Sequence, residues 1–355
     1  MKNLKTVFYI SLLSILSLTF SCSKNEVKSP SPANKNVYLF GEEFVYGYSI
    51  DQNPIKAMFW KNGESTILPE GTNTVASCAS GNDIYVISRE GKCWKNGVRK
   101  LLPASQDGST IFDANSISVI NDDIYMTGRS IDGNQIIKPT FWKNGQPTNF
   151  NLPSANAQII NLTLVNNSFY VLGYVTEIIP NPYGGLQSVQ KYKYWKNGIE
   201  NIISDESLIN PNFYSISANK IFVSSTNDIY ILGYNSGILK CYKNGISIGD
   251  FINARSFNAI DVVNNDVYIV GSKFNFTENK TLPAYWKNGE ATYITDGIVG
   301  ATLNSIKVVG NDIYIGGFGL NNEGIVTAKF WKNGVANQVK DLVTKTKSNT
   351  ILITD

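Results

Sequence analysis

A sevenfold repeat is the strongest constraint on how this chain can fold. An aromatic residue followed by Lys-Asn-Gly recurs along the sequence, and all six tryptophans of the protein occupy its first position. The motifs are Trp60–Gly63, Trp94–Gly97, Trp142–Gly145, Trp195–Gly198, Tyr242–Gly245, Trp286–Gly289 and Trp331–Gly334. Successive motifs are 34 to 53 residues apart. Self-similarity at such a period indicates repeated supersecondary units.

Each repeat also carries the pattern of a hairpin upstream of the motif. In the third repeat, Ile117–Ile120 and Asp123–Gly128 are joined by Asn121 and Asp122. Short runs of β-branched and aromatic residues bounded by Asn, Asp and Gly predict strands and tight turns. The Asn-Gly pair of every motif predicts a second hairpin, because both central residues of a type I′ turn need positive φ. One repeat therefore predicts four strands.

A four-stranded unit of about 45 residues is typical of a propeller blade. Immunoglobulin-like domains need about 100 residues, and the coils of a β-helix are much shorter than these units. No segment after the N-terminal region has a sustained 3.6-residue apolar period, so we expect few helices. We predict an all-β fold over residues 36–355, a single seven-bladed β-propeller of four-stranded blades.

The two ends of this region predict how the ring closes. The first repeat begins at Asn36 with the pattern of a second strand, so its inner strand is missing. Thr350–Thr354, after the last motif, resembles the inner strand Ser305–Val309. We expect this C-terminal strand to complete blade one, which would remove the open edge that a stack of sheets exposes.

The first 21 residues have the pattern of a lipoprotein signal peptide. Lys2 and Lys5 precede the apolar segment Thr6–Phe20, whose 15 residues are too short for a membrane span. Ser21-Cys22 resembles a lipobox, in which a small residue precedes a cysteine that becomes diacylated, although Thr19 stands where leucine is usual. The resemblance implies lipidation of Cys22, and simple cleavage after Ser21 is the alternative.

Residues 22–35 are rich in Ser, Pro, Asn and Lys and predict a flexible tether. Ser23, rather than an aspartate, follows the cysteine. Aspartate there is associated with retention at the inner membrane. We therefore expect a lipid-anchored protein of the outer membrane, facing either the periplasm or the cell surface.

Composition excludes several classes of function. The sequence contains no histidine, which rules out His-based acid–base catalysis, Ser-His-Asp triads and histidine metal sites. The net charge is +3 without a long basic run, so nucleic acid is not an expected partner. Cys78, Cys93 and Cys241 are expected as free thiols in the blades. We predict no cofactor and no metal.

The repeated residues themselves have structural interpretations. One Trp per blade at a fixed strand position is expected to pack between blades, rather than to form sugar-stacking platforms. The seven motif lysines should form a ring on one face, together with Asp83, Asp123, Asp228, Asp266 and Asp312. We favour a solvated rim with local charge compensation over an anion-binding ring.

Because both tight turns share one face, variation in length collects on the other face, where recognition usually occurs. A long insertion lies there in blade four, between Val175 and Gln190. The candidate binding residues on this face are Tyr174, Tyr183, Tyr234, Phe274, Phe276 and Phe318. Ser118, Thr163, Asp261 and Lys307 occupy equivalent inner-strand positions and are expected to line the central channel. Asp261 and Lys307 are the candidate contacts there.

Through its Trp-Lys-Asn-Gly repeats, the chain from residue 36 to 355 resembles the β-propeller lipoproteins of Bacteroidota. The resemblance implies the fold and the envelope location, but propellers host unrelated functions. We expect a monomeric, non-catalytic binding scaffold that engages an envelope protein or glycan and meets the membrane only through its lipid. Two alternatives stay open. One is a propeller-type polysaccharide lyase or glycoside hydrolase, for which two carboxylates about 5–10 Å apart would be needed. The other is an envelope assembly factor.

Overall fold

The computed structural model describes residues 35–44, 55–135, 137–148, 157–166, 168–181, 184–202, 220–235, 238–251, 253–294, 300–339 and 344–355. The expected signal peptide, Cys22 and nearly all of the tether lie outside these residues. The Asn-Gly turns have the predicted backbone conformation. All seven motif asparagines have φ between 49° and 51°, and the following glycines between 82° and 90°. These are the positive φ angles that a type I′ turn requires.

The strands form seven separate four-stranded antiparallel sheets, which are the blades. In the order of blades one to seven, the inner strands are β28 (Lys345–Thr354), β4 (Thr74–Ser80), β8 (Thr110–Ile120), β12 (Ala157–Val165), β16 (Lys220–Val223), β20 (Ala254–Val263) and β24 (Thr302–Val309). The second strands are β1 (Asn36–Phe44), β5 (Asp83–Ser88), β9 (Asp123–Ile131), β13 (Ser168–Pro180), β17 (Ile229–Asn235), β21 (Asp266–Asn275) and β25 (Asp312–Leu320).

The third strands end in the repeated motif and lead through its turn into the outer strands. The third strands are β2 (Ile55–Lys61), β6 (Cys93–Lys95), β10 (Ile137–Lys143), β14 (Leu186–Lys196), β18 (Ile238–Lys243), β22 (Lys280–Lys287) and β26 (Val326–Lys332). The outer strands are β3 (Glu64–Ile67), β7 (Val98–Lys100), β11 (Gln146–Thr148), β15 (Ile199–Ile202), β19 (Ile246–Phe251), β23 (Glu290–Tyr293) and β27 (Val335–Gln338).

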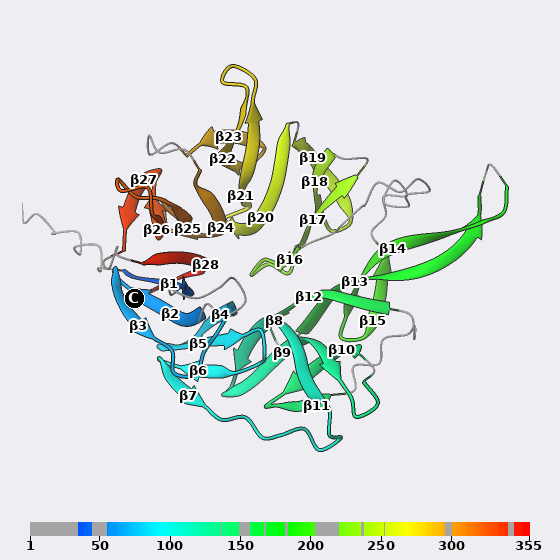
Figure 1. Cartoon of the computed structure of the whole chain (residues 1–355). Coiled ribbons are helices and arrows are strands. Elements are labelled where there is room, and N and C mark those ends of the chain that lie inside the picture. Colours follow the sequence, from blue (N-terminus) through cyan, green and yellow to red (C-terminus); the bar gives the residue numbers. More distant parts are fainter. Residues whose placement is uncertain are drawn as a thin grey trace, which may run out of the picture. The chain divides into compact units, whose positions relative to one another are not determined.

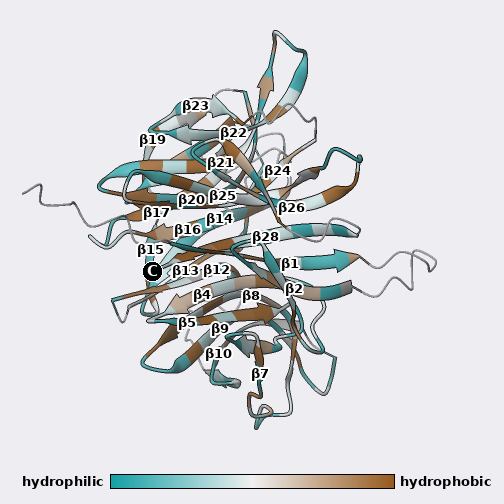
Figure 2. Ribbon diagram, turned by 90° about the vertical axis from the view of Figure 1, so that its left-hand side faces the viewer, coloured by the Kyte–Doolittle hydropathy of each residue, from teal (hydrophilic) through white to brown (hydrophobic). Residues whose placement is uncertain are grey.

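The seven sheets of the unit Lys35–Asp355 are arranged as a seven-bladed β-propeller, with the inner strands around the central axis (Figure 1). Hydrophobic and hydrophilic segments alternate along the strands in the side view (Figure 2). The described residues contain no helix, so none of them belongs to a helix that could cross a membrane. The predicted fold class is confirmed.

The C-terminal strand completes blade one, as predicted. β28 pairs with β1 in antiparallel register, with Ile351 opposite Leu39 and Leu352 opposite Tyr38. Leu352 therefore occupies the place that Lys307 has in blade seven, opposite Tyr314. Blade one thus joins strands from the two ends of the propeller.

Each motif aromatic packs against the preceding blade. The six indoles and the Tyr242 ring are at most 1% exposed. Trp286 of blade six clusters with Tyr230 and Cys241 of blade five, and Trp331 of blade seven clusters with Tyr268 of blade six. Trp60 closes the ring by clustering with Tyr314 of blade seven. The sugar-platform interpretation is wrong, because these rings are buried between sheets.

A bulge in most inner strands links neighbouring blades near the axis. At the bulge the pairing register between the inner strand and the second strand shifts, and the two backbones come close together. A Cβ on Gly271 would lie 1.9 Å from the Ser256 carbonyl oxygen, so only glycine fits this close approach. Four asparagines at the bulges donate to a backbone carbonyl of the next blade, namely Asn115 to Ile160, Asn258 to Leu303, Asn304 to Ser348 and Asn349 to Thr74.

We predict that Trp286→Ala lowers the free energy of unfolding by about 3–5 kcal/mol, because it leaves a cavity between blades five and six. Trp286→Tyr should cost less, because blade five carries Tyr242 in the same position. Denaturant unfolding monitored by circular dichroism measures both variants, and the exposed Glu290→Gln serves as the control. An alanine variant as stable as the parent would contradict the packing role of this position.

Candidate functional site

The face that carries the Asn-Gly turns, here called the turn face, repeats the same contacts in every blade. The motif asparagine accepts a hydrogen bond through Oδ1 from a backbone N–H at the start of the second strand, as Asn288 does from Val267 at 2.8 Å. Its own backbone N–H donates to the carbonyl of the same residue at 2.9 Å. The asparagine therefore joins the turn to the second strand of its own blade.

The motif lysines are neutralised locally in five blades. The ion pairs are Lys95–Asp83, Lys143–Asp123, Lys243–Asp228, Lys287–Asp266 and Lys332–Asp312, with N–O distances of 2.6 to 2.9 Å. Each of these ammonium groups also lies over the tyrosine of the second strand, at 5.2 to 5.6 Å from the ring centroid. The predicted charge compensation is present there. Blades one and four differ, because Asn36 and Ser168 stand where the other blades have aspartate.

These ion pairs predict acid sensitivity. The hydrogen bond from Lys287, followed by that from Asn288, lowers the pKa of Asp266 below its ordinary value of 3.8. When the pKa of a carboxyl group is lower in the folded than in the unfolded protein, its ionised form stabilises the fold at pH values above the unfolded-state pKa. This stabilisation is lost as the pH falls through the folded-state pKa. The melting temperature of the parent should therefore exceed that of Asp266→Asn at neutral pH, with a difference that shrinks below about pH 4. A difference independent of pH, measured by thermal melts across this range, would contradict the prediction.

The opposite face, here called the loop face, does not repeat itself. Each second strand has a tyrosine opposite the motif lysine, and the residue four positions further on lies toward the loop face. In blades one to seven these residues are Glu42, Arg89, Arg129, Tyr174, Tyr234, Ser272 and Phe318. We call them the loop-face ring. Sequence analysis identified three of them, Tyr174, Tyr234 and Phe318, but missed that they are equivalent to the charged residues of blades one to three.

The first three members of the loop-face ring belong to a charged cluster. Asp113 on β8 accepts from Arg129 at 2.6 Å and lies 3.7 Å from Arg89. Burial raises the pKa of Glu42, and the amide of Asn349 and the charges of Lys347 and Arg89 oppose this rise only in part. The Asn349 amide reaches the Glu42 carboxylate only at 3.5 Å, so hydrogen-bonding capacity remains for a ligand.

Glu42 and Arg89 line an open polar cavity of about 350 Å³ between blades one and two, together with Asn73, Thr74, Val75 and Asn349. A second cavity, of about 430 Å³, adjoins blade one and contains Glu43, Thr344 and Thr346. Each cavity contains one carboxylate. The two facing carboxylates that glycoside hydrolysis needs are therefore not brought together in either cavity.

Aromatic residues occupy the loop-face ring in blades four, five and seven, whereas blade six has Ser272 there. The Tyr174 ring is tilted by 50° relative to the Tyr192 ring, with centroids 5.5 Å apart, and it packs against the core between blades four and five. The Phe318 ring lies 5.1 Å from the Lys347 ammonium, which is equally far from the Phe44 ring. Tyr234 is on β17, but its side chain is outside the described part of the chain, as is all of Tyr183.

Phe274 and Phe276 lie together at the end of β21. Their ring centroids are 4.9 Å apart in an edge-to-face arrangement, and the Arg255 guanidinium lies over Phe274 at 5.1 Å. Phe276 is 71% exposed. Tyr234, Phe274 and Phe318 belong to strands rather than to loops, because the second strands continue further toward the loop face than the repeat pattern indicated.

The insertion of blade four is a paired hairpin rather than an irregular loop. β13 and β14 remain in register from Val175 opposite Lys191 to Pro180 opposite Leu186. This hairpin extends beyond the other blades (Figure 1). Ile178 and Leu186 near its tip are 71% and 74% exposed.

The two inner-strand candidates contact each other. The Lys307 ammonium lies 3.1 Å from Oδ1 of Asp261, and Oδ2 of Asp261 accepts from the backbone N–H of Val308 at 2.7 Å. The Asp261 side chain is only 3% exposed, whereas that of Lys307 is 42% exposed. Asp261 therefore joins blades six and seven instead of opening onto the channel as expected. Ser118 and Thr163 occupy the equivalent register positions, opposite Tyr125 and Tyr170.

The cysteines of the blades are buried or half-buried free thiols. Burial raises the pKa of the Cys78 thiol to about 12 and that of Cys93 to about 11. Burial also raises the pKa of Cys241 to about 12. Protonated thiols at neutral pH are poor nucleophiles. Within the described ranges, no three Cys, Asp or Glu side chains gather as a metal site would require.

Sequence reasoning missed Glu42, Arg89, Arg129, Lys347 and Asn349. The signal for the first three was available, because aligning the repeats on the second-strand tyrosine places them beside Tyr174 and Phe318. Lys347 and Asn349 belong to the strand that closes blade one. Their place beside Glu42 depends on pairing between the two ends of the propeller.

Neither protein-family models nor curated proteins match this chain. Its fold is similar to solved structures. A puromycin hydrolase variant is 8% identical with a TM-score of 0.50, over 86% of this chain and 52% of that one. The computationally designed Ika8 protein is 13% identical with a TM-score of 0.44, over 89% of this chain and 96% of that one. The propeller domain of the Trilobed protease from Pyrococcus furiosus is 13% identical with a TM-score of 0.44, over 86% and 92%. At these identities the likeness is one of fold alone.

Proposed function

We propose that this chain is a non-catalytic binding module of the cell envelope, which engages a protein or a glycan through its loop face. The contrast between the two faces carries this proposal. On the turn face, the repeated asparagines and most of the repeated lysines are satisfied by contacts within their own blades. On the loop face, equivalent positions carry a carboxylate, two guanidinium groups, aromatic rings and a hydroxyl. Variation on a rigid scaffold is typical of recognition surfaces.

Side chains suited to recognition are available on this face. Phe276 and the tip of the blade-four hairpin are exposed apolar groups. Arg89, whose contact with Asp113 is long, and the half-buried Glu42 supply donors and acceptors in blades one and two. The two described cavities lined by Glu42 and by Glu43 each contain one carboxylate, so neither of them supports hydrolysis by a carboxylate pair.

We further propose that the chain belongs with the β-propeller lipoproteins of Bacteroidota and is anchored as a monomer to the outer membrane through Cys22. The described chain starts at Lys35, whose ammonium pairs with Asp355, and Asn36 contacts the Asn62 turn. Lys35, at the end of the proposed tether, therefore lies at the turn face of the propeller.

Replacement of residues 177–188 by a short turn like that of blade two, which keeps the buried Val175 and Val189, should abolish capture of the envelope partner and preserve the fold. The hairpin supplies exposed apolar surface on the loop face, whereas the blade core does not depend on its tip. Pulldown from native envelopes, with a thermal melt of each protein, measures the two properties separately. Lys332→Met on the turn face is the matched control. Undiminished capture by the shortened protein would refute the loop-face assignment.

Cys22→Ser should prevent incorporation of radiolabelled palmitate and should release the protein from the membrane fraction, because the lipid is its proposed attachment. Stable anchoring by acyl chains follows from about 0.8 kcal/mol per buried methylene. Fractionation and autoradiography of cells expressing each form provide the measurement. A serine variant that remains in the membrane fraction would contradict the anchor.

A further inference from the structure

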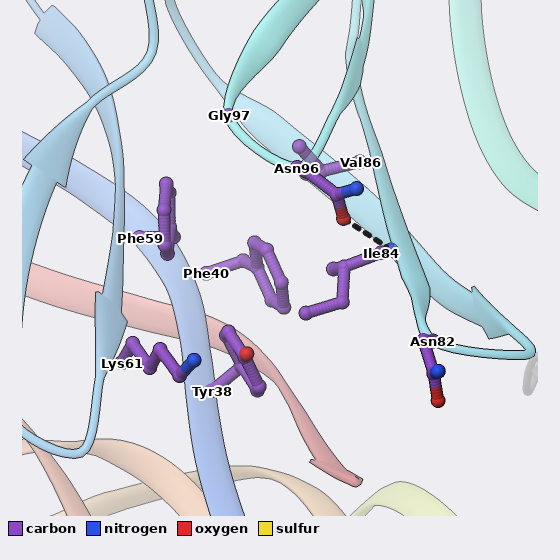
Figure 3. A pocket seen from close by; sticks show the side chains of 9 residues that line it. All are labelled: Tyr38, Phe40, Phe59, Lys61, Asn82, Ile84, Val86, Asn96 and Gly97. Atoms are coloured by element: carbon purple, nitrogen blue, oxygen red, sulfur yellow. Dashed lines mark hydrogen bonds between the residues drawn. The ribbon is translucent and has the colours of Figure 1, made fainter.

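A cavity of about 300 Å³ lies between blades one and two at the turn face, and the proposed function does not use it (Figure 3). Tyr38, Phe40 and Phe59 of blade one form one wall, and Ile84 and Val86 of blade two form the other. Phe40 and Val86 are each 2% exposed, so the floor is part of the apolar core. Lys61 lies at the rim.

The repeat provides an internal comparison for Lys61. In five blades the motif lysine pairs with an aspartate at the start of the second strand. Blade one has Asn36 at this position, and Asn36 accepts from the turn residue Asn62 at 3.1 Å. Within the described residues, no carboxylate lies within ion-pairing distance of Lys61, whose ammonium lies 5.5 Å from the Tyr38 ring centroid. Lys61 therefore carries a positive charge that five other blades cancel.

Blade four shows a side chain that fills the space equivalent to the cavity. Phe169 in blade four is equivalent to Ile84 in blade two. In both blades, the backbone N–H of this residue donates to the side-chain oxygen of the motif asparagine. The Phe169 ring fills the space beside Tyr125 and Phe141 of blade three, with centroids 5.3 and 5.2 Å apart. Ile84 is smaller, so the matching space beside Tyr38 and Phe59 remains open.

We propose that this cavity is a binding site for a small organic anion with an apolar, ring-sized body, such as an aromatic carboxylate. The apolar body would occupy the space that a phenylalanine ring fills between blades three and four. The anionic group would take the place of the missing aspartate beside Lys61. The volume is at the lower end of small-ligand sites, which span about 300–1,000 Å³. The site lies on the face opposite the proposed recognition surface and is independent of it.

The test is calorimetric titration of the full chain with 3-phenylpropionate and with its neutral analogue 3-phenylpropanamide. The carboxylate should bind about tenfold more tightly, because only it can pair with the Lys61 ammonium. Two variants use changes that the other blades already contain. Asn36→Asp restores the carboxylate of the repeat and should abolish the preference for the anion. Ile84→Phe should fill the cavity and abolish binding of both compounds.

Lys332→Met is the matched control, because it removes a motif lysine that is already paired with Asp312, and it should leave both affinities unchanged. Thermal melts establish that each variant is folded. Equal affinity for the carboxylate and the amide would overturn the proposal. So would unchanged binding to a folded Ile84→Phe variant, or no binding of the carboxylate at millimolar concentration.

Discussion

The ring depends on side-chain packing between sheets, because each sheet completes its hydrogen-bond ladders within its own blade. A sheet with two apolar faces is stable only when both faces are covered. One large aromatic ring per blade meets this requirement, since Trp or Tyr at the motif position packs against the tyrosine strand of the preceding blade. The last interface, between Trp60 and Tyr314, needs the first and seventh blades to be neighbours. The ring must therefore close for the last pair of blades to pack against each other.

The same repeat divides the molecule into two faces with different chemical roles. On the turn face, asparagine joins turn to strand, and lysine pairs with aspartate in most blades, so little hydrogen-bonding capacity remains. Blade one departs from this pattern through Asn36, and the cavity beside Lys61 lies at that departure. On the loop face the equivalent positions differ between blades: they are charged in blades one to three, aromatic in blades four, five and seven, and a serine in blade six.

Much of the fold could be predicted from the repeat because its signals are local. Asn-Gly specifies a turn with positive φ, and alternating apolar residues specify strands. The blade-four insertion was harder to predict, because pairing between its two arms depends on strands that only the finished blade aligns. The loop-face ring was found only in part. Arg89 and Arg129 have no distinctive neighbours in sequence, and Asp113, which they share, lies on a different strand.

The sequence by itself determined the number of blades, the turn type, the strand that closes the ring and the burial of the motif aromatics. Each of these follows from a short sequence pattern within the repeat, and its recurrence in seven repeats makes a chance match improbable. Tertiary structure alone decided which residues meet across blades. Asp261 binds the backbone of blade seven, Lys347 lies between Phe44 and Phe318, and Ile84 leaves open the space that Phe169 fills. These contacts join residues distant in the chain, and their geometry is set by how adjacent sheets pack, which no local pattern encodes.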